Sequence, residues 1–143
     1  MKLIIGSDHA GFELKEKVKD YLKQLKHETE DLGAFSEKPV DYPLIAKEVA
    51  KKVAKTGSTG ILICGSGIGM CISANKIKGV RAALVYDEYT AKVSREHNNA
   101  NILCIGARTG SAKNYKKIVD VFLTTPNSKE DRHLRRIKEM DSL

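Results

Sequence analysis

The sequence has no apolar run long enough to cross a bilayer. Its longest runs, at residues 61–64 and 82–85, fall far short of the roughly 20 apolar residues that a spanning helix needs. Residues 1–6 also lack the apolar core and cleavage site of a signal peptide. We therefore expect a cytoplasmic protein with no membrane partner.

Cysteine is scarce. Cys64, Cys71 and Cys104 make an odd number, and none belongs to a Cys-x-x-Cys pair. This composition argues against a disulfide framework and against a zinc site, so we expect three reduced thiols and no metal. Cys104 lies in an apolar run and Cys71 in an apolar helical segment, where both are predicted to be small buried groups.

Negative charge is also in deficit, because 18 acidic residues oppose 25 Lys and Arg and leave a formal net charge of +7. Clustered basic residues can bind nucleic-acid phosphates. Most lysines, such as Lys15, Lys19 and Lys23, instead fall on the polar faces of predicted amphipathic helices, for which a solvated surface is the ordinary explanation. We expect no nucleic-acid partner, although the basic cluster at residues 132–136 stands out.

The chain does have a regular alternation of short apolar runs and longer helical periods, which is typical of βαβ units and a parallel sheet. We expect residues 1–143 to form one α/β domain, a three-layer, doubly wound sheet of the flavodoxin-like or Rossmann-like type with an extra C-terminal helix. The five strands are predicted at residues 2–6, 28–32, 60–64, 81–85 and 101–106.

Helix starts are marked by capping and turn residues. Pro43 suits the first turn of the second helix, and Asp87 and Ser111 are the predicted N-caps of the fourth and fifth. Ser128 with Asp131 resembles a capping box for the C-terminal helix.

The order 2-1-3-4-5 is the commonest for five such strands, and it places a ligand crevice beyond the carboxyl ends of strands one and three. The segments richest in chemically active residues follow those two strands. They are residues 6–11, Gly-Ser-Asp-His-Ala-Gly, and residues 64–69, Cys-Gly-Ser-Gly-Ile-Gly.

The second of these segments is suited to holding negative charge, because three alternate glycines let backbone N–H groups converge on an anion. Glycine also serves simple turns, so the signal is weak alone. The segment lacks the Gly-Lys-Ser/Thr ending of a P-loop and the spacing of a dinucleotide site. Cys64 directly before it is a usable base or nucleophile, since the same dipoles favour its thiolate form. A cysteine phosphatase would need an arginine at the far end of the loop, where this chain has Met70.

Six segments, in the right order along nearly the whole chain, together resemble the ribose-5-phosphate isomerase B family. They are residues 7–11 (Ser-Asp-His-Ala-Gly), 41–43 (Asp-Tyr-Pro), 63–69 (Ile-Cys-Gly-Ser-Gly-Ile-Gly), 74–76 (Ala-Asn-Lys), 94–98 (Ser-Arg-Glu-His-Asn) and Arg132-His133 with Arg136. The resemblance implies an aldose-ketose isomerase that interconverts ribose 5-phosphate and ribulose 5-phosphate through an enediolate in the pentose phosphate pathway, with no metal and no cofactor.

Residue roles follow from the resemblance. Cys64 would accept the proton, His97 would be the acid that opens the sugar ring, and Asp8 and His9 would bind the sugar. The other implied substrate contacts are Gly65, Ser66, Gly67, Ile68, Gly69, Asn98, Arg108, Arg132 and Arg136. Some relatives use a glutamate just past the loop, but Met70 stands there in this chain.

Each of these assignments has a structural alternative. Ser66 could shuttle a proton between two sugar oxygens or simply cap the loop. His97 could be an ordinary histidine at a helix C-terminus. Arg132 and Arg136, four residues apart, could grip one phosphate from one helix face or form a solvated basic surface. At the level of the whole protein, the alternatives are an isomerase of allose or galactose 6-phosphate and a non-catalytic sugar-phosphate or nucleic-acid binding module.

Strand direction indicates that the site is shared. Cys64 ends a strand, whereas His97 and Asn98 precede one, so they should lie at opposite edges of a parallel sheet, about 16 Å apart for five residues of roughly 3.3 Å each. We therefore expect a homodimer whose two chains complete each other's sites, and the sequence leaves a tetramer of such dimers open.

Overall fold

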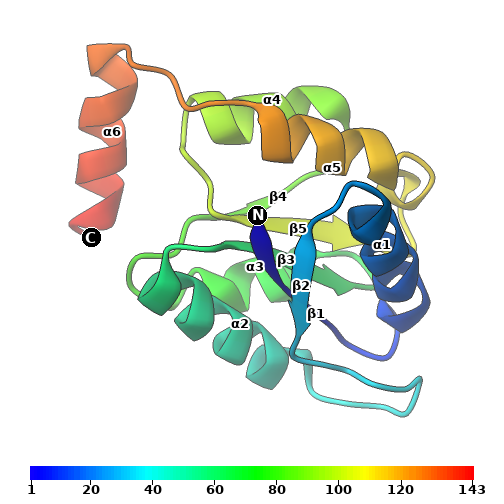
Figure 1. Cartoon of the computed structure of the whole chain (residues 1–143). Helices are drawn as coiled ribbons and strands as arrows, with labels where there is room; N and C mark the ends of the chain where they lie inside the picture. Colours follow the sequence, from blue (N-terminus) through cyan, green and yellow to red (C-terminus); the bar gives the residue numbers. More distant parts are fainter.

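Five parallel strands lie between two layers of helices in the computed structural model, which describes all of residues 1–143 (Figure 1). The strands are β1 (Lys2–Ser7), β2 (Glu28–Asp31), β3 (Thr59–Cys64), β4 (Ala82–Leu84) and β5 (Ile102–Gly106). The helices are α1 (Phe12–Gln24), α2 (Tyr42–Thr56), α3 (Ile68–Ala74), α4 (Glu88–Glu96), a short 3-10 turn η1 (Gly110–Ala112), α5 (Tyr115–Thr124) and α6 (Asp131–Asp141). The predicted α/β sheet with an extra C-terminal helix is confirmed.

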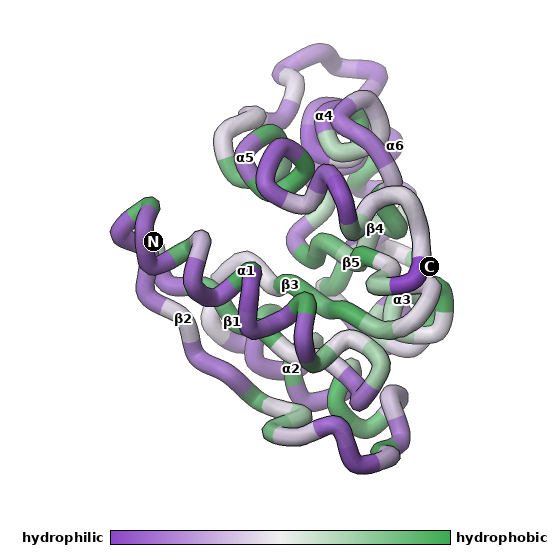
Figure 2. The backbone as a smooth tube through the Cα atoms, turned by 90° about the vertical axis from the view of Figure 1, so that its right-hand side faces the viewer, coloured by the Kyte–Doolittle hydropathy of each residue, from purple (hydrophilic) through white to green (hydrophobic).

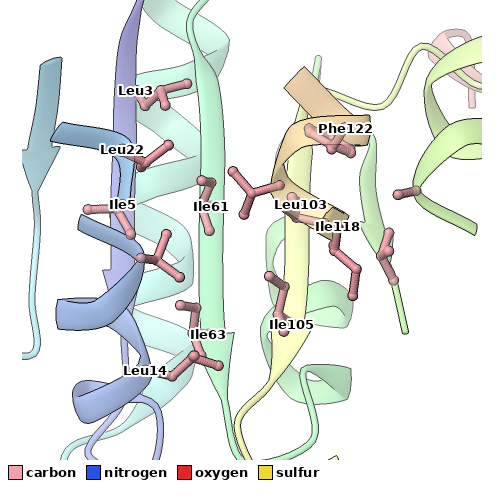
Figure 3. Close-up of a cluster of buried hydrophobic side chains, with 14 of the residues drawn as sticks. Leu3, Ile5, Leu14, Leu22, Ile61, Ile63, Leu103, Ile105, Ile118 and Phe122 are labelled. Carbon is pink, nitrogen blue, oxygen red and sulfur yellow. The ribbon is translucent and has the colours of Figure 1, made fainter. Parts of the chain in front are cut away.

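Apolar side chains alternate between the two faces of the central strands, and this alternation explains the three layers. Leu3, Ile5 and Ile61 point to the face covered by α1, α4 and α5, where Phe122 also packs (Figure 3). The neighbouring strand positions point to the other face, which α2 and α3 cover. In Figure 2 β3 and β5 run as hydrophobic segments through the middle of the molecule, whereas the edge strand β2 is hydrophilic. None of the helices combines the length and the hydropathy that spanning a bilayer requires.

The strand order is β2-β1-β3-β5-β4, so the expected order 2-1-3-4-5 is wrong at its far end. All five residues of β5 are buried, and β5 pairs with both β3 and β4. By contrast, β4 has only three residues, all half-buried, which suits an edge position. The exchange matters for the site, because it places Gly106 beside Cys64 and brings the loop after β5 next to the loop after β3.

Two of the four predicted helix starts are correct. Pro43 lies in the first turn of α2, and Asp87 caps α4 in a reciprocal capping box with Thr90. Ser111 does not cap α5, whose N-cap is Asn114. Ser111 lies in the turn η1 instead, and its hydroxyl donates a hydrogen bond to the Gly106 carbonyl. The Ser128 hydroxyl accepts a hydrogen bond from the N–H of Glu130, which is the N-cap of α6, so the predicted capping box is also wrong.

Lys15 is fully buried, contrary to the solvated position expected from its helix face. Its Nζ lies 2.7 Å from Asp31 Oδ2 and donates to the Ala34 carbonyl. Burial alone would raise the pKa of Asp31, but hydrogen bonds from Lys15, Lys19 and the Gly33 N–H lower it. Lys15 thus ties the end of β2 and the segment that follows it to α1. That segment in turn accepts a hydrogen bond from the Ser7 N–H at the end of β1.

Candidate active site

An open cleft of about 610 Å³ lies at the carboxyl edge of the sheet, where β1 and β3 end. Most of the predicted site residues line it, namely Asp8, His9, Cys64, Gly65, Ser66, Ile68, Gly69 and Arg108. The crevice predicted from the strand directions is therefore present, and it gathers residues from three separate loops.

Cys64 lies at the end of β3 and is 4% exposed, and its Sγ accepts a hydrogen bond from the Gly67 N–H at 3.1 Å. Gly67 has φ +79°, and a Cβ there would lie 2.6 Å from the Leu84 side chain, so this turn requires glycine. This backbone N–H holds the sulfur in place beside the glycine loop. The geometry therefore supplies a cysteine that can act as a base at the cleft.

The loop amides are divided between the protein and the cleft. The Gly67 N–H donates to the Cys64 sulfur, and the Ile68 N–H donates to the Ser66 hydroxyl at 3.2 Å. The N–H groups of Gly65 and Ser66 donate to no group of the chain. Unpaired amides in such a loop are suited to a developing oxyanion. Ser66 does cap the loop, and its exposed hydroxyl can still donate a proton.

Asp8 and His9 are held in place by backbone contacts. Asp8 is 6% exposed, and its Oδ1 accepts from the Gly11 N–H at 2.9 Å. Nδ1 of His9 accepts from the Val40 N–H at 3.2 Å. An accepting Nδ1 assigns the imidazole hydrogen to Nε2, so the neutral ring can donate from that nitrogen.

Arg108 lies over the glycine loop because β5 is the neighbour of β3. Its N–H donates to the Gly65 carbonyl at 2.9 Å, and the N–H of Ala107 donates to the Cys64 carbonyl at 2.8 Å. A Cβ built on Gly65 would lie 3.6 Å from Nη1 of Arg108. The arginine thus brings a positive charge to the cleft that holds Cys64.

Tyr42 lines the same cleft and was not among the predicted site residues. Its ring packs so closely on the loop that a Cβ on Gly69 would come within 2.5 Å of it. A sequence signal was available, because Tyr42 belongs to the Asp-Tyr-Pro segment that contributes to the family resemblance. Ile72 and Thr109 also line the cleft and were missed.

The remaining predicted residues lie elsewhere in the chain. His97 is the C-cap of α4, and its ring stacks on His133 of α6 with centroids 4.3 Å apart. Asn98 lines a different cleft of about 750 Å³, beside Arg81 and the last residues of α6. This larger cleft contains no cysteine, so size alone does not identify the site.

Arg132 and Arg136 are exposed on α6, and neither lines the Cys64 cleft. Nε of Arg132 pairs with Glu130 at 2.7 Å, whereas Arg136 forms no ion pair. Their neighbour Arg135 pairs with Glu139 one turn along the helix, as in an ordinary solvated surface. One chain therefore brings together the predicted base and the loop but leaves the predicted acid and phosphate ligands apart from them.

The other two cysteines differ from Cys64 and from each other. Cys104 is fully buried, as predicted, and burial raises the pKa of its thiol. Cys71 is only half-buried, and a hydrogen bond with Cys104 lowers its pKa to about 7. No group of three or more His, Cys, Asp or Glu side chains lies where it could hold a metal ion.

Comparison with known proteins shows what the chain as a whole is similar to. The chain is 46% identical over 139 residues to the ribose-5-phosphate isomerase B of Mycobacterium tuberculosis (strain ATCC 25618 / H37Rv), a match that covers 96% of this chain and 86% of that protein. The structure of the ribose 5-phosphate isomerase from Thermotoga maritima is similar with a TM-score of 0.95 and 48% identity, covering 99% of this chain and 98% of that one.

The ribose-5-phosphate isomerase B of Mycoplasma genitalium, solved with bound ribulose-5-phosphate, has a TM-score of 0.92 and 44% identity, covering 99% of this chain and 94% of that one. The model of the Ribose/Galactose Isomerase family matches residues 3–140. The chain therefore belongs to the ribose/galactose isomerase family.

Proposed function

We propose that this protein interconverts ribose 5-phosphate and ribulose 5-phosphate by moving a proton between two adjacent sugar carbons. The observation that carries the proposal is Cys64 at the carboxyl-edge cleft, with the Gly67 N–H on its sulfur and two unpaired loop amides beside it. Relatives covering nearly the whole chain are named for this activity.

The chemistry requires a base and a group that stabilises the enediolate. The Cys64 thiolate removes the proton from C2 of the open-chain aldose, and the electron pair moves onto the C1 oxygen, where the Gly65 and Ser66 amides can donate. Returning the proton from the Cys64 thiol to C1 gives the ketose. Ser66 is placed to transfer the hydroxyl proton between the two oxygens, which completes the proton balance.

The other substrate contacts divide between two chains of a homodimer. Asp8, His9 and Arg108 hold the sugar in the Cys64 cleft, and His97, with the helix that carries Arg132 and Arg136, comes from the neighbouring subunit. Support comes from the placement of His97, Arg132 and Arg136 away from the Cys64 cleft of their own chain. We further propose a cytoplasmic role in the pentose phosphate pathway, consistent with three cysteines that form no disulfide.

An isomerase assay tests the proposal directly. We expect turnover of ribose 5-phosphate in the presence of a chelator, and slower turnover of allose 6-phosphate and galactose 6-phosphate. A preference for a hexose phosphate would change the substrate, and loss of activity with chelator would overturn the metal-free mechanism. Inactivity on all three sugars, with retained binding, would favour a sugar-phosphate binding module.

The two α6 arginines give a second test. Arg132→Ala or Arg136→Ala should raise the Michaelis constant for ribose 5-phosphate at least tenfold, because a phosphate dianion needs charge-assisted donors. The slow reaction of unphosphorylated ribose should change little. Arg135→Ala, which removes an arginine paired with Glu139, is the matched control. Equal losses on both sugars would mean that the arginines serve folding or assembly instead.

A further inference from the structure

The stacked imidazoles of His97 and His133 are a main attachment of α6 to the rest of its chain. Their ring centroids are 4.3 Å apart and their planes differ by 5°. Figure 1 shows α6 standing beside the body of the molecule at the end of an extended segment. Only His133 and Ile137 of α6 are buried, and the Arg81–Asp141 ion pair at 2.6 Å is a further contact near the end of the helix.

The helix held by this stack is also the helix that carries the proposed phosphate ligands. Arg132 precedes His133 by one residue, and Arg136 follows it by three, so all three lie within about one helical turn. His97, in contrast, belongs to the end of α4. The stack therefore sets where the helix that carries the two arginines lies relative to the His97 imidazole.

We infer that His133 is a positioning residue: its ring fixes the plane of the His97 imidazole and holds that acid at a set distance from Arg132 and Arg136. The inference rests on the proposed function, since it assigns His133 a part in arranging the same reaction. In this role His133 transfers no proton and does not contact the substrate. What the position requires is a flat aromatic ring.

The charges around His133 agree with a role as an uncharged face. Burial lowers the pKa of His133, and the nearby side chains of His97, Arg132 and Arg136 lower it further, while Glu130 acts in the opposite direction. At neutral pH the ring is therefore uncharged, so it can stack on His97 whether or not His97 carries a proton. Two stacked imidazolium rings beside two arginines would repel each other.

A pair of substitutions separates stacking from titration. His133→Phe keeps a flat ring but cannot be protonated, and it should keep kcat and KM for ribose 5-phosphate within about threefold. His133→Asn keeps polarity but removes the ring, and it should lower kcat at least tenfold and raise KM, because small displacements of a catalytic group are costly. Thermal unfolding of both variants serves as the control for folding.

Every other kinetic pattern overturns the inference. Loss in both variants would mean that the imidazole itself acts on the substrate, and wild-type behaviour in both would mean that the stack has no role. Loss only in His133→Phe would assign the role to polarity. Inactivity of the wild-type protein would instead remove the proposed function, and with it this inference.

Nuclear magnetic resonance tests the stack itself, independently of the kinetics. In the wild type, cross-relaxation should connect the ring protons of His97 and His133. The pKa of His133 should lie below that of an ordinary histidine, which is about 6.5. In His97→Asn the titration of His133 should move up only part of the way, since burial remains. The absence of ring-to-ring cross-relaxation would contradict the stacked arrangement.

Discussion

Cys64→Ala should reduce the isomerisation of ribose 5-phosphate by at least about 100-fold, the usual lower bound for the worth of a general base. Cys64 is the only thiol that lines the carboxyl-edge cleft, and Met70, just past the loop, cannot replace it as a base. Substrate affinity should change little, because a general base acts in the transition state rather than in the ground-state complex. The measurements are steady-state kinetics and direct binding of ribulose 5-phosphate by calorimetry.

Cys71→Ala is the matched control. Cys71 lies on α3, seven residues along the chain from Cys64. Its pKa is lowered to about 7, so its thiol could itself act as a base near neutral pH. Its Sγ bonds to the Ala82 carbonyl rather than to the loop, and it does not line the Cys64 cleft. This variant should keep its activity. If Cys64→Ala retained more than about a tenth of the wild-type rate, Cys64 could not be the base.

The fold was predictable because its determinants are local and repetitive. Continuous apolar runs located β3 and β5, and alternation with helical periods identified the parallel sheet. The exchange of β4 and β5 was not predictable in this way, because choosing the commonest strand order takes no account of the length of each strand. The contrast between three half-buried residues in β4 and five buried ones in β5 was the physical signal.

For the candidate site too, the features set by local sequence were predictable, and those set by contacts between distant segments were not. Residues next to a strand end, such as Asp8 and Cys64, could be placed from strand direction alone, and they line one cleft. Tyr42 reaches that cleft through packing against Gly69, a contact between segments distant in sequence. Lys15 was misplaced for a similar reason: helical periodicity reports which face of α1 is polar, but not that Asp31 covers it.

Sites completed by two chains predict that two inactive variants restore each other. In one chain, Cys64 pairs in register with Gly106 at the carboxyl edge, and Gly60 pairs with Ile102 at the amino edge. His97 precedes Ile102 and ends α4, which begins after β4 at the carboxyl edge and runs back to the amino edge. The strand between the two edges spans about 16 Å, more than an imidazole side chain can bridge.

Mixing Cys64→Ala with His97→Ala should therefore recover about a quarter of wild-type activity, under conditions that let subunits exchange. Half of the dimers in a statistical mixture contain one chain of each kind, and in those dimers one of the two sites receives both intact residues. Each variant alone should stay nearly inactive. The measurement is the rate per site after mixing, with two different affinity tags to quantify the mixed dimer.

Mixing His97→Ala with a His97→Ala chain that carries the other tag is the matched control, because the same exchange then brings no intact His97 into any dimer. A recovery that rises with the fraction of mixed dimer would support the shared site. If exchange were complete and the rate stayed at the level of the separate variants, Cys64 and His97 would have to act within one chain. The distance between the two sheet edges would then have to be closed by a movement of α4 and α6.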